Sequence, residues 1–152
     1  MWRSVVILAT LLLGGCLPPQ AEKGAQQQAL QLQQQLGLSY LQQQRLSLAR
    51  EHLQRAAHLA TISHPAWGEI QYGLGLVAMR SGAEVVAENH FQQALAANPP
   101  YLEAANGYGV LLCRQGKVKE ADHYFLRVIN NPEYNTPEVA VANRKRCGEE
   151  RR

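Results

Sequence analysis

Residues 70–133 read IQYGLGLVAMRSGAEVVAENHFQQALAANPPYLEAANGYGVLLCRQGKVKEADHYFLRVINNPE, and this stretch repeats itself every 34 positions. Four pairs of like residues align at that shift: Gly75 with Gly109, Ala87 with Ala121, Glu88 with Asp122, and Phe91 with Phe125. A third copy lies upstream at a shift of 38, with matches at Gly37, Ala49, Leu53 and Ala56. We expect its four extra residues in the connection Thr61–His64, where an insertion between helices costs little.

A 34-residue period with a small residue in mid-helix, an aromatic residue four positions later and a terminal proline is the tetratricopeptide (TPR) pattern. Each repeat is a pair of antiparallel helices that buries its apolar face only by stacking on its neighbours. The sequence therefore predicts an all-α TPR helical solenoid of about three repeats plus the start of a fourth. We expect the repeated glycines to face the repeated alanines, and Leu53, Phe91 and Phe125 to fill the space between repeats.

Apolar periodicity and turn residues divide the chain into helices. The predicted helices cover Gln26–Gln44, Ser47–Ala60, Ala66–Ser81, Ala83–Ala97, Tyr101–Gln115, Lys117–Asn130 and Thr136–Cys147. Residues 26–135 would then form the three-repeat array, and 136–152 a partial fourth repeat with a basic tail. The glutamine-rich first segment keeps an apolar stripe at Leu30, Leu36, Tyr40 and Leu41, which favours a helix over a low-complexity segment.

The N-terminus predicts a lipid anchor. Arg3 precedes an apolar run from Val5 to Leu13, which is too short to span a bilayer and is typical of a signal-peptide core. The run ends in Leu13-Gly14-Gly15-Cys16, which resembles the bacterial lipobox, and an ordinary signal peptide with an incidental cysteine is the alternative. By the lipobox interpretation residues 1–15 are removed, Cys16 is lipidated, and residues 16–25 form a tether. Several acyl chains on one residue anchor a protein stably.

The charge distribution argues against nucleic acid as a partner. Residues 16–143 carry nine Lys or Arg against ten Asp or Glu, so the body is nearly neutral. The formal charge of +3 comes from Arg3 and from a basic tail over residues 144–152. Nucleic-acid binding calls for a basic stripe on one face, whereas a short basic terminus is typical of a solvated, frayed end.

Three cysteines occur, and with Cys16 lipidated the remaining pair is Cys113 and Cys147. They are 34 residues apart and so occupy equivalent positions on stacked first helices. A disulfide would pin the last helix to the array in an oxidising compartment. Neighbouring helix axes lie about 8–10 Å apart, while bridged Cα atoms need about 4.4–6.8 Å, so the sequence leaves the bond open.

Motifs for catalysis are absent from the sequence: it has no phosphate loop, no HExxH, no CxxC and no nucleophile elbow. His52 and His90 share one repeat position, but two histidines without a third ligand are weak evidence for a metal site. We therefore expect neither an enzyme nor a cofactor or metal site.

Function is then expected on the groove that the first helices of a TPR array line. The repeat register gives a mostly apolar trough with two cations and a tyrosine, suited to an amphipathic or strand-like partner segment. Some of these positions could instead pack within the chain. The predicted lining residues are Gln34, Leu38, Leu41, Tyr72, Leu76, Met79, Arg80, Asn106, Val110 and Arg114.

Several stretches resemble the PilF/PilW-type pilotins of type IV pilus biogenesis. They are the lipobox, the glutamine-rich leader, QLGLSYLQQQRLSLAREHLQRA from residue 35, NGYGVLLCRQGKVKEADHYF from residue 106, and PEYNTPEVAVAN from residue 132. The resemblance covers roughly residues 1–143. Members of that family have about six repeats, so it implies a chain shortened at the C-terminus.

The resemblance implies a lipoprotein on the periplasmic face of the outer membrane that binds the secretin subunit and promotes its localisation and multimerisation. Cys16 would carry the anchor, and repeats one and two would carry the secretin contact through Leu38, Leu41, Tyr72, Leu76 and Met79. The alternative is a general periplasmic TPR scaffold lipoprotein that recruits envelope or cell-wall enzymes.

Overall fold

The computed structural model describes residues 19–149, and within this range every regular element is a helix. The seven helices are α1 (Pro19–Gln42), α2 (Leu46–Leu59), α3 (Trp67–Arg80), α4 (Glu84–Leu95), α5 (Glu103–Arg114), α6 (Val118–Ile129) and α7 (Pro137–Glu149). All seven predicted helices are present, which confirms the all-α class.

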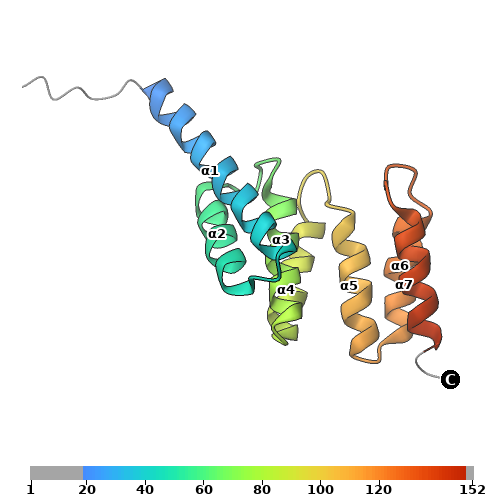
Figure 1. The fold of residues 1–152 in the computed structure, drawn as a ribbon. Helices are drawn as coiled ribbons and strands as arrows, with labels where there is room; N and C mark the ends of the chain where they lie inside the picture. Colours follow the sequence, from blue (N-terminus) through green and yellow to red (C-terminus); the bar gives the residue numbers. More distant parts are fainter. Residues whose placement is uncertain (1–18, 150–152) are drawn as a thin grey trace, which may run out of the picture.

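The helices form consecutive antiparallel pairs that stack side by side in chain order (Figure 1). Within each pair the contacts are close, and each second helix also packs on the first helix of the next pair. The last described helix, α7, packs on both α6 and α5. The array is therefore a three-repeat TPR solenoid followed by the first helix of a fourth repeat, as the period predicts.

The start of α1 corrects the predicted tether. The predicted tether covers residues 16–25 and the predicted first helix begins at Gln26, but α1 already begins at Pro19. Proline is tolerated in the first turn because its missing N–H would be unpaired there anyway, and alanine, glutamate, lysine and glutamine follow, which are good helix formers. This first part of α1 is exposed and extends away from the array (Figure 1).

The four extra residues of the first repeat do not lie in the connection, so that expectation was wrong. The connections 60–66, 96–102 and 130–136 all have the same length. Instead, α2 and α3 have 14 residues each, whereas α4 and α5 have 12. The insertion therefore extends the end of α2 and the start of α3 by half a turn each, where the added backbone groups gain helical hydrogen bonds.

The repeated glycines lie closest to the large residues of the second helices. A Cβ added to Gly75 would lie 2.6 Å from Cε1 of Phe91, and one added to Gly107 would lie 3.1 Å from the same atom. Phe91 is thus held between a glycine of its own repeat and a glycine of the next. Leu53 has the same arrangement between Gly37 and Gly73. Each large residue needs two close helix approaches, which glycine allows.

The turn inside each repeat needs a left-handed residue. Gly82 and Gly116 have φ of +77° and +81°, and Gln44, at the equivalent position of repeat one, has φ of +60°. This conformation costs an L-residue about 1–2 kcal/mol, because its Cβ crowds the following carbonyl.

Replacing Gln44 with glycine is therefore expected to raise the free energy of unfolding by about 0.5–1 kcal/mol, after the greater unfolded-state entropy of glycine is subtracted. Urea unfolding followed by circular dichroism measures the change. Gln43→Gly is the matched control and should destabilise the protein, because Gln43 has no positive φ and its side chain donates to Ser39 Oγ at 3.1 Å. A loss of stability in Gln44→Gly would contradict the strain argument.

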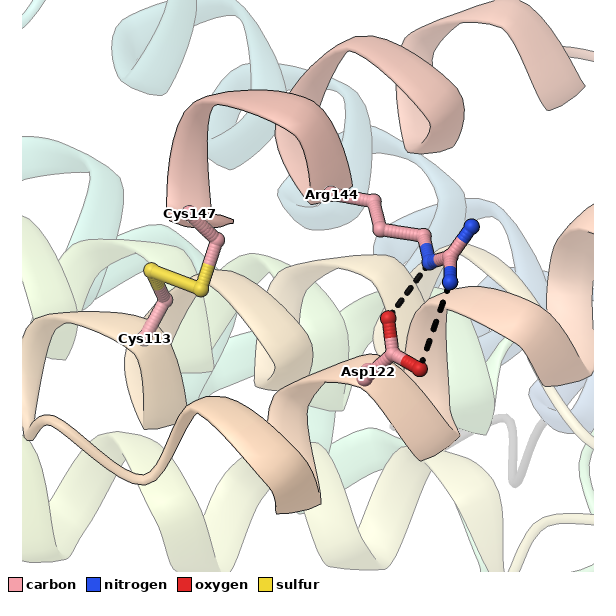
Figure 2. A network of polar contacts seen from close by, with 4 residues as sticks. All are labelled: Cys113, Asp122, Arg144 and Cys147. Atoms are coloured by element: carbon pink, nitrogen blue, oxygen red, sulfur yellow. Dashed lines mark hydrogen bonds and ion pairs between the residues drawn. A yellow bond between two sulfur atoms is a disulfide. The ribbon is translucent and has the colours of Figure 1, made fainter. Parts of the chain in front are cut away.

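Figure 2 shows two of the side-chain links that attach α7 to repeat three. Cys113 of α5 and Cys147 of α7 form a disulfide with their Cα atoms 5.7 Å apart, inside the range that the bond needs. One turn earlier on α7, the Arg144 guanidinium donates to both carboxylate oxygens of Asp122 in α6. The stacking of equivalent positions thus brings the two cysteines together across 34 residues of chain.

Candidate functional site: the open face of the first helices

An apolar row crosses the solenoid on the open face of the first helices. Leu38 of α1, Leu76 of α3 and Val110 of α5 occupy equivalent positions and are all half-buried. Their helices contact one another in chain order, so the three side chains form one row rather than three separate spots. We call this surface, with the flanking residues described below, the first-helix face.

Tyr72 lies one turn before Leu76 on the same face of α3. Its ring packs against Phe91 and Tyr101, with centroids 6.1 Å and 5.3 Å away. Burial raises the pKa of the Tyr72 hydroxyl to about 12, and the nearby Tyr134 and Glu103 add to the rise. The hydroxyl is therefore neutral at any physiological pH, available as a hydrogen-bond donor rather than as a charge.

Cationic side chains stand at the C-terminal end of the face. Arg80 and Arg114 are exposed at equivalent positions in the last turns of α3 and α5. Arg80 also donates to the backbone oxygen of Leu41, at 3.0 Å, and so links repeat two to repeat one.

Gln34 of α1 is half-buried and donates to a carboxylate oxygen of Glu69.

Three residues predicted to line the groove are buried instead. Leu41, Met79 and Asn106 have 5%, 9% and 9% of their surface exposed. Leu41 belongs to the apolar core that repeats one and two share, and Met79 to the core that repeats two and three share. Asn106 accepts a hydrogen bond from Asn143 of α7 at 3.1 Å. These positions hold the array together. The face offered to a partner therefore comprises Gln34, Leu38, Tyr72, Leu76, Arg80, Val110 and Arg114.

Two carboxylates on this face were not predicted. Glu69 and Glu103 are half-buried in the first turns of α3 and α5, at the opposite end from the arginines. Both lie near Tyr101, and their charges contribute, after burial, to raising its pKa. The repeat itself could have revealed them, because they are 34 residues apart and precede Leu76 and Val110 by the same two turns.

The histidines act within the repeats. His52 Nδ1 lies 2.7 Å from the Gln33 side-chain oxygen, and His90 Nδ1 lies 2.7 Å from that of Gln71. Burial lowers the pKa of His90. Among the described residues, no group of three or more His, Cys, Asp or Glu side chains is placed to hold a metal ion.

The predicted lipid-anchor residue, Cys16, lies outside the described residues, as does the end of the basic tail. Between residues 19 and 149, no helix combines the length and the apolar character that a membrane span requires.

A family model described as "Tetratricopeptide repeat" matches residues 35–88 and 85–135, together well over half of the chain. The chain belongs to the tetratricopeptide repeat family. The first range runs from within α1 to within α4, the second from within α4 to beyond α6, and together they include most of the first-helix face. Proteins built from such repeats present extended surfaces for other proteins, which is the use that an open, half-apolar face suggests.

Two solved structures share this TPR arrangement. One is reported under "Functional Characterization of Pseudomonas Aeruginosa pilF", with a TM-score of 0.71 and 22% identity over 83% of this chain and 55% of that chain. The other is "Crystal structure of PilW, widely conserved type IV pilus biogenesis factor", with a TM-score of 0.69 and 26% identity over 81% and 55%. This TPR protein is thus similar to PilF and PilW and spans about half of their length. No curated protein matches the chain significantly.

The geometry of the face supports binding rather than chemistry. It combines an apolar row, a neutral, half-buried tyrosine and opposite charges at the two ends. Apolar area gives affinity, and the charges give orientation and partner choice.

Proposed function

We propose that this TPR chain is an adaptor rather than an enzyme: an outer-membrane lipoprotein that binds the secretin subunit of a type IV pilus system. It would promote localisation and multimerisation of the secretin through the first-helix face. The observation that carries the proposal is the likeness to PilF and PilW over more than four-fifths of the chain. The lipobox-like sequence at Cys16 supports the membrane address.

The physical logic needs no catalytic step. An acyl chain on Cys16 would confine the TPR array to the membrane surface, and about 0.8 kcal/mol of affinity accrues per buried CH₂ group. Client subunits captured by the array would then share that surface, which raises their effective concentration and favours assembly into a ring. The first-helix face would bind the client subunit, and the acyl anchor would hold the complex at the membrane.

The test measures secretin multimers in outer-membrane fractions of a host that lacks its own pilotin. The wild-type chain is expected to restore multimers, whereas Cys16→Ala should leave them lost or mislocalised. Leu76→Glu places a charge in the apolar row and should abolish the effect. Val85→Glu is its matched control, because Val85 is 83% exposed on the second helix α4 and lies off the first-helix face.

Three outcomes would oppose the proposal. A well-expressed, correctly localised wild-type chain that restores nothing would move the general periplasmic scaffold ahead of the pilotin. Full activity of Leu76→Glu would remove the first-helix face from the mechanism. Equal loss in Val85→Glu would show that added charge, rather than the position on the face, is responsible, and circular dichroism of both variants checks that they fold.

A further inference from the structure

The first-helix face is divided into three parallel rows of different character. The first helices of the three repeats run in the same direction, so equivalent positions line up across the solenoid (Figure 1). The carboxylates of Glu69 and Glu103 form a row at the N-terminal ends of α3 and α5. Leu38, Leu76 and Val110 form the central apolar row. The guanidinium groups of Arg80 and Arg114 form a row at the C-terminal ends.

The rows share one face because of their spacing along each helix. In α3 the residues are Glu69, Leu76 and Arg80, which are separated by seven and four positions, and Glu103, Val110 and Arg114 repeat that spacing in α5. Residues seven and four apart lie on one side of an α-helix. Acidic first turns and basic last turns also stabilise the helices through the macrodipole. Because the first helices pack in parallel, their acidic first turns lie side by side and form an acidic edge. Their basic last turns form a basic edge in the same way.

Repeat one carries the apolar row but not the charges. The positions equivalent to Glu69 and Arg80 are Gln31 and Gln42, which are both exposed and neutral. The acidic and basic edges therefore cover only repeats two and three, and the face has a neutral end and a charged end. A bound segment can be recognised along its length as well as across its width.

We propose that the occupant of this face is an amphipathic helix that lies across the three first helices, with basic residues along one flank of its apolar stripe and acidic residues along the other. A helix carries side chains on both flanks of an apolar stripe and can meet both edges at once. A β-strand lying in the same direction would present its backbone to the two edges. The charged flanks would lie over repeats two and three, and the end over repeat one would be neutral.

This inference deepens the proposed function, since it rests on the first-helix face being the partner surface, but it does not depend on the client being a secretin. The probes are three synthetic helical peptides of about 18 residues, which span about 27 Å at 1.5 Å per residue. The split peptide has lysines on one flank and glutamates on the other. The mixed peptide has the same composition and apolar stripe, with both charges on each flank. An extended peptide with alternating leucines represents the strand.

Binding to the purified chain is measured by fluorescence anisotropy at low and high salt. The split peptide is expected to bind roughly fivefold more tightly than the mixed peptide, because several exposed ion pairs with the two edges each add a little to the affinity. The preference should fade as salt screens the edges. A peptide with its two flanks exchanged should still bind, but in the opposite direction along the face. Rotating the bound helix by 180° in the plane of the face brings its basic flank back to the acidic edge and its acidic flank back to the basic edge.

The protein variant Glu103→Gln/Arg114→Gln removes one residue from each edge without changing the net charge. Neither side chain makes a side-chain hydrogen bond with another residue in the 19–149 range, so the variant should keep the fold and lose only a small stabilisation of the α5 dipole. This variant should lose most of the preference for the split peptide. Glu120→Gln/Arg127→Gln on α6 is the matched control, since both residues are exposed on a second helix, and it should keep the preference.

Equal affinity for the split and mixed peptides, tighter binding of the extended peptide, or no binding of any peptide would overturn the inference. An unchanged preference in Glu103→Gln/Arg114→Gln would do the same. These failures are distinguishable from failure of the proposed function, because no secretin enters the peptide assay. Restored secretin multimers together with equal peptide affinities would support the pilotin role and contradict the inference that the occupant is a helix with charged flanks.

Discussion

Replacing Phe91 with alanine is expected to lower the free energy of unfolding by about 3–5 kcal/mol, the range found for large aromatic residues in well-packed cores. Phe91 is fully buried and packs between Gly75 and Gly107, with the Tyr72 and Tyr108 rings 6.1 Å and 6.4 Å away. The cost consists of lost apolar burial and of the cavity that remains. Two of the walls are glycine backbone, which has no side chain to move into the space.

Phe125→Ala is the informative comparison. Phe125 has Gly109 on its own repeat, but the position equivalent to Gly107 in the next helix is Val141, which is 50% exposed. A cavity of about 140 Å³ already lies beside Phe125, lined also by Val110, Cys113, Arg114, Asn143, Arg146 and Cys147. Because the packing there is looser, we expect Phe125→Ala to cost less than Phe91→Ala.

Urea unfolding followed by far-UV circular dichroism measures both changes. Val85→Ala is the surface control and should lie within about 0.5 kcal/mol of wild type. A loss below about 1 kcal/mol in Phe91→Ala would show that the helices on either side collapse into the space. A larger loss in Phe125→Ala than in Phe91→Ala would contradict the argument from the two glycines.

The repeat period predicts which positions are equivalent, and from it the helices and their order follow. It does not predict how deeply each position is buried, because burial depends on neighbours that the period does not identify. Leu41 and Met79 show this clearly: both fit the register of the groove, but each packs into an apolar core that two adjacent repeats share. The period also aligns the glycines with the alanines of the second helices, but it does not identify the large side chain that lies nearest to each glycine.

Local propensity explains the other differences. The helix-forming residues after Pro19 outweigh the tether suggested by two prolines and a polar stretch. The carboxylates Glu69 and Glu103 could have been found by comparing repeats position by position, since the same signal located the arginines. These charges form two edges because of their spacing along each helix, which places them on the same face as the apolar row.

Removing the disulfide is expected to free α7 from the array. The bond closes a loop of 34 residues, for which the chain-entropy model gives about 4 kcal/mol of stabilisation. The other attachments of α7 are weaker. The Asp122–Arg144 ion pair is exposed and worth about 0–1 kcal/mol, and the Asn143–Asn106 hydrogen bond contributes about 0.5–1.5 kcal/mol. Within α7 only Ala140 and Cys147 are buried.

The loss should be local before it is global, because a repeat contacts only its neighbours. In Cys113→Ala/Cys147→Ala, amide hydrogens of residues 137–149 are expected to lose most of their exchange protection, while those of α3 and α4 keep theirs. Hydrogen exchange read by mass spectrometry resolves the two regions. Wild-type protein in reductant should behave like the double variant, which separates loss of the bond from loss of the sulfur atoms in the packing.

Asp122→Asn is the matched control, since it removes the ion pair between α6 and Arg144 of α7 and leaves the disulfide in place. Its effect on α7 protection should be small. If instead Asp122→Asn exposes α7 and the double cysteine variant does not, the helix is held by its electrostatics rather than by the bond. In that case the polar contacts of α7 would be sufficient to hold this helix against repeat three. The disulfide would then add to the stability of a helix that already packs there without it.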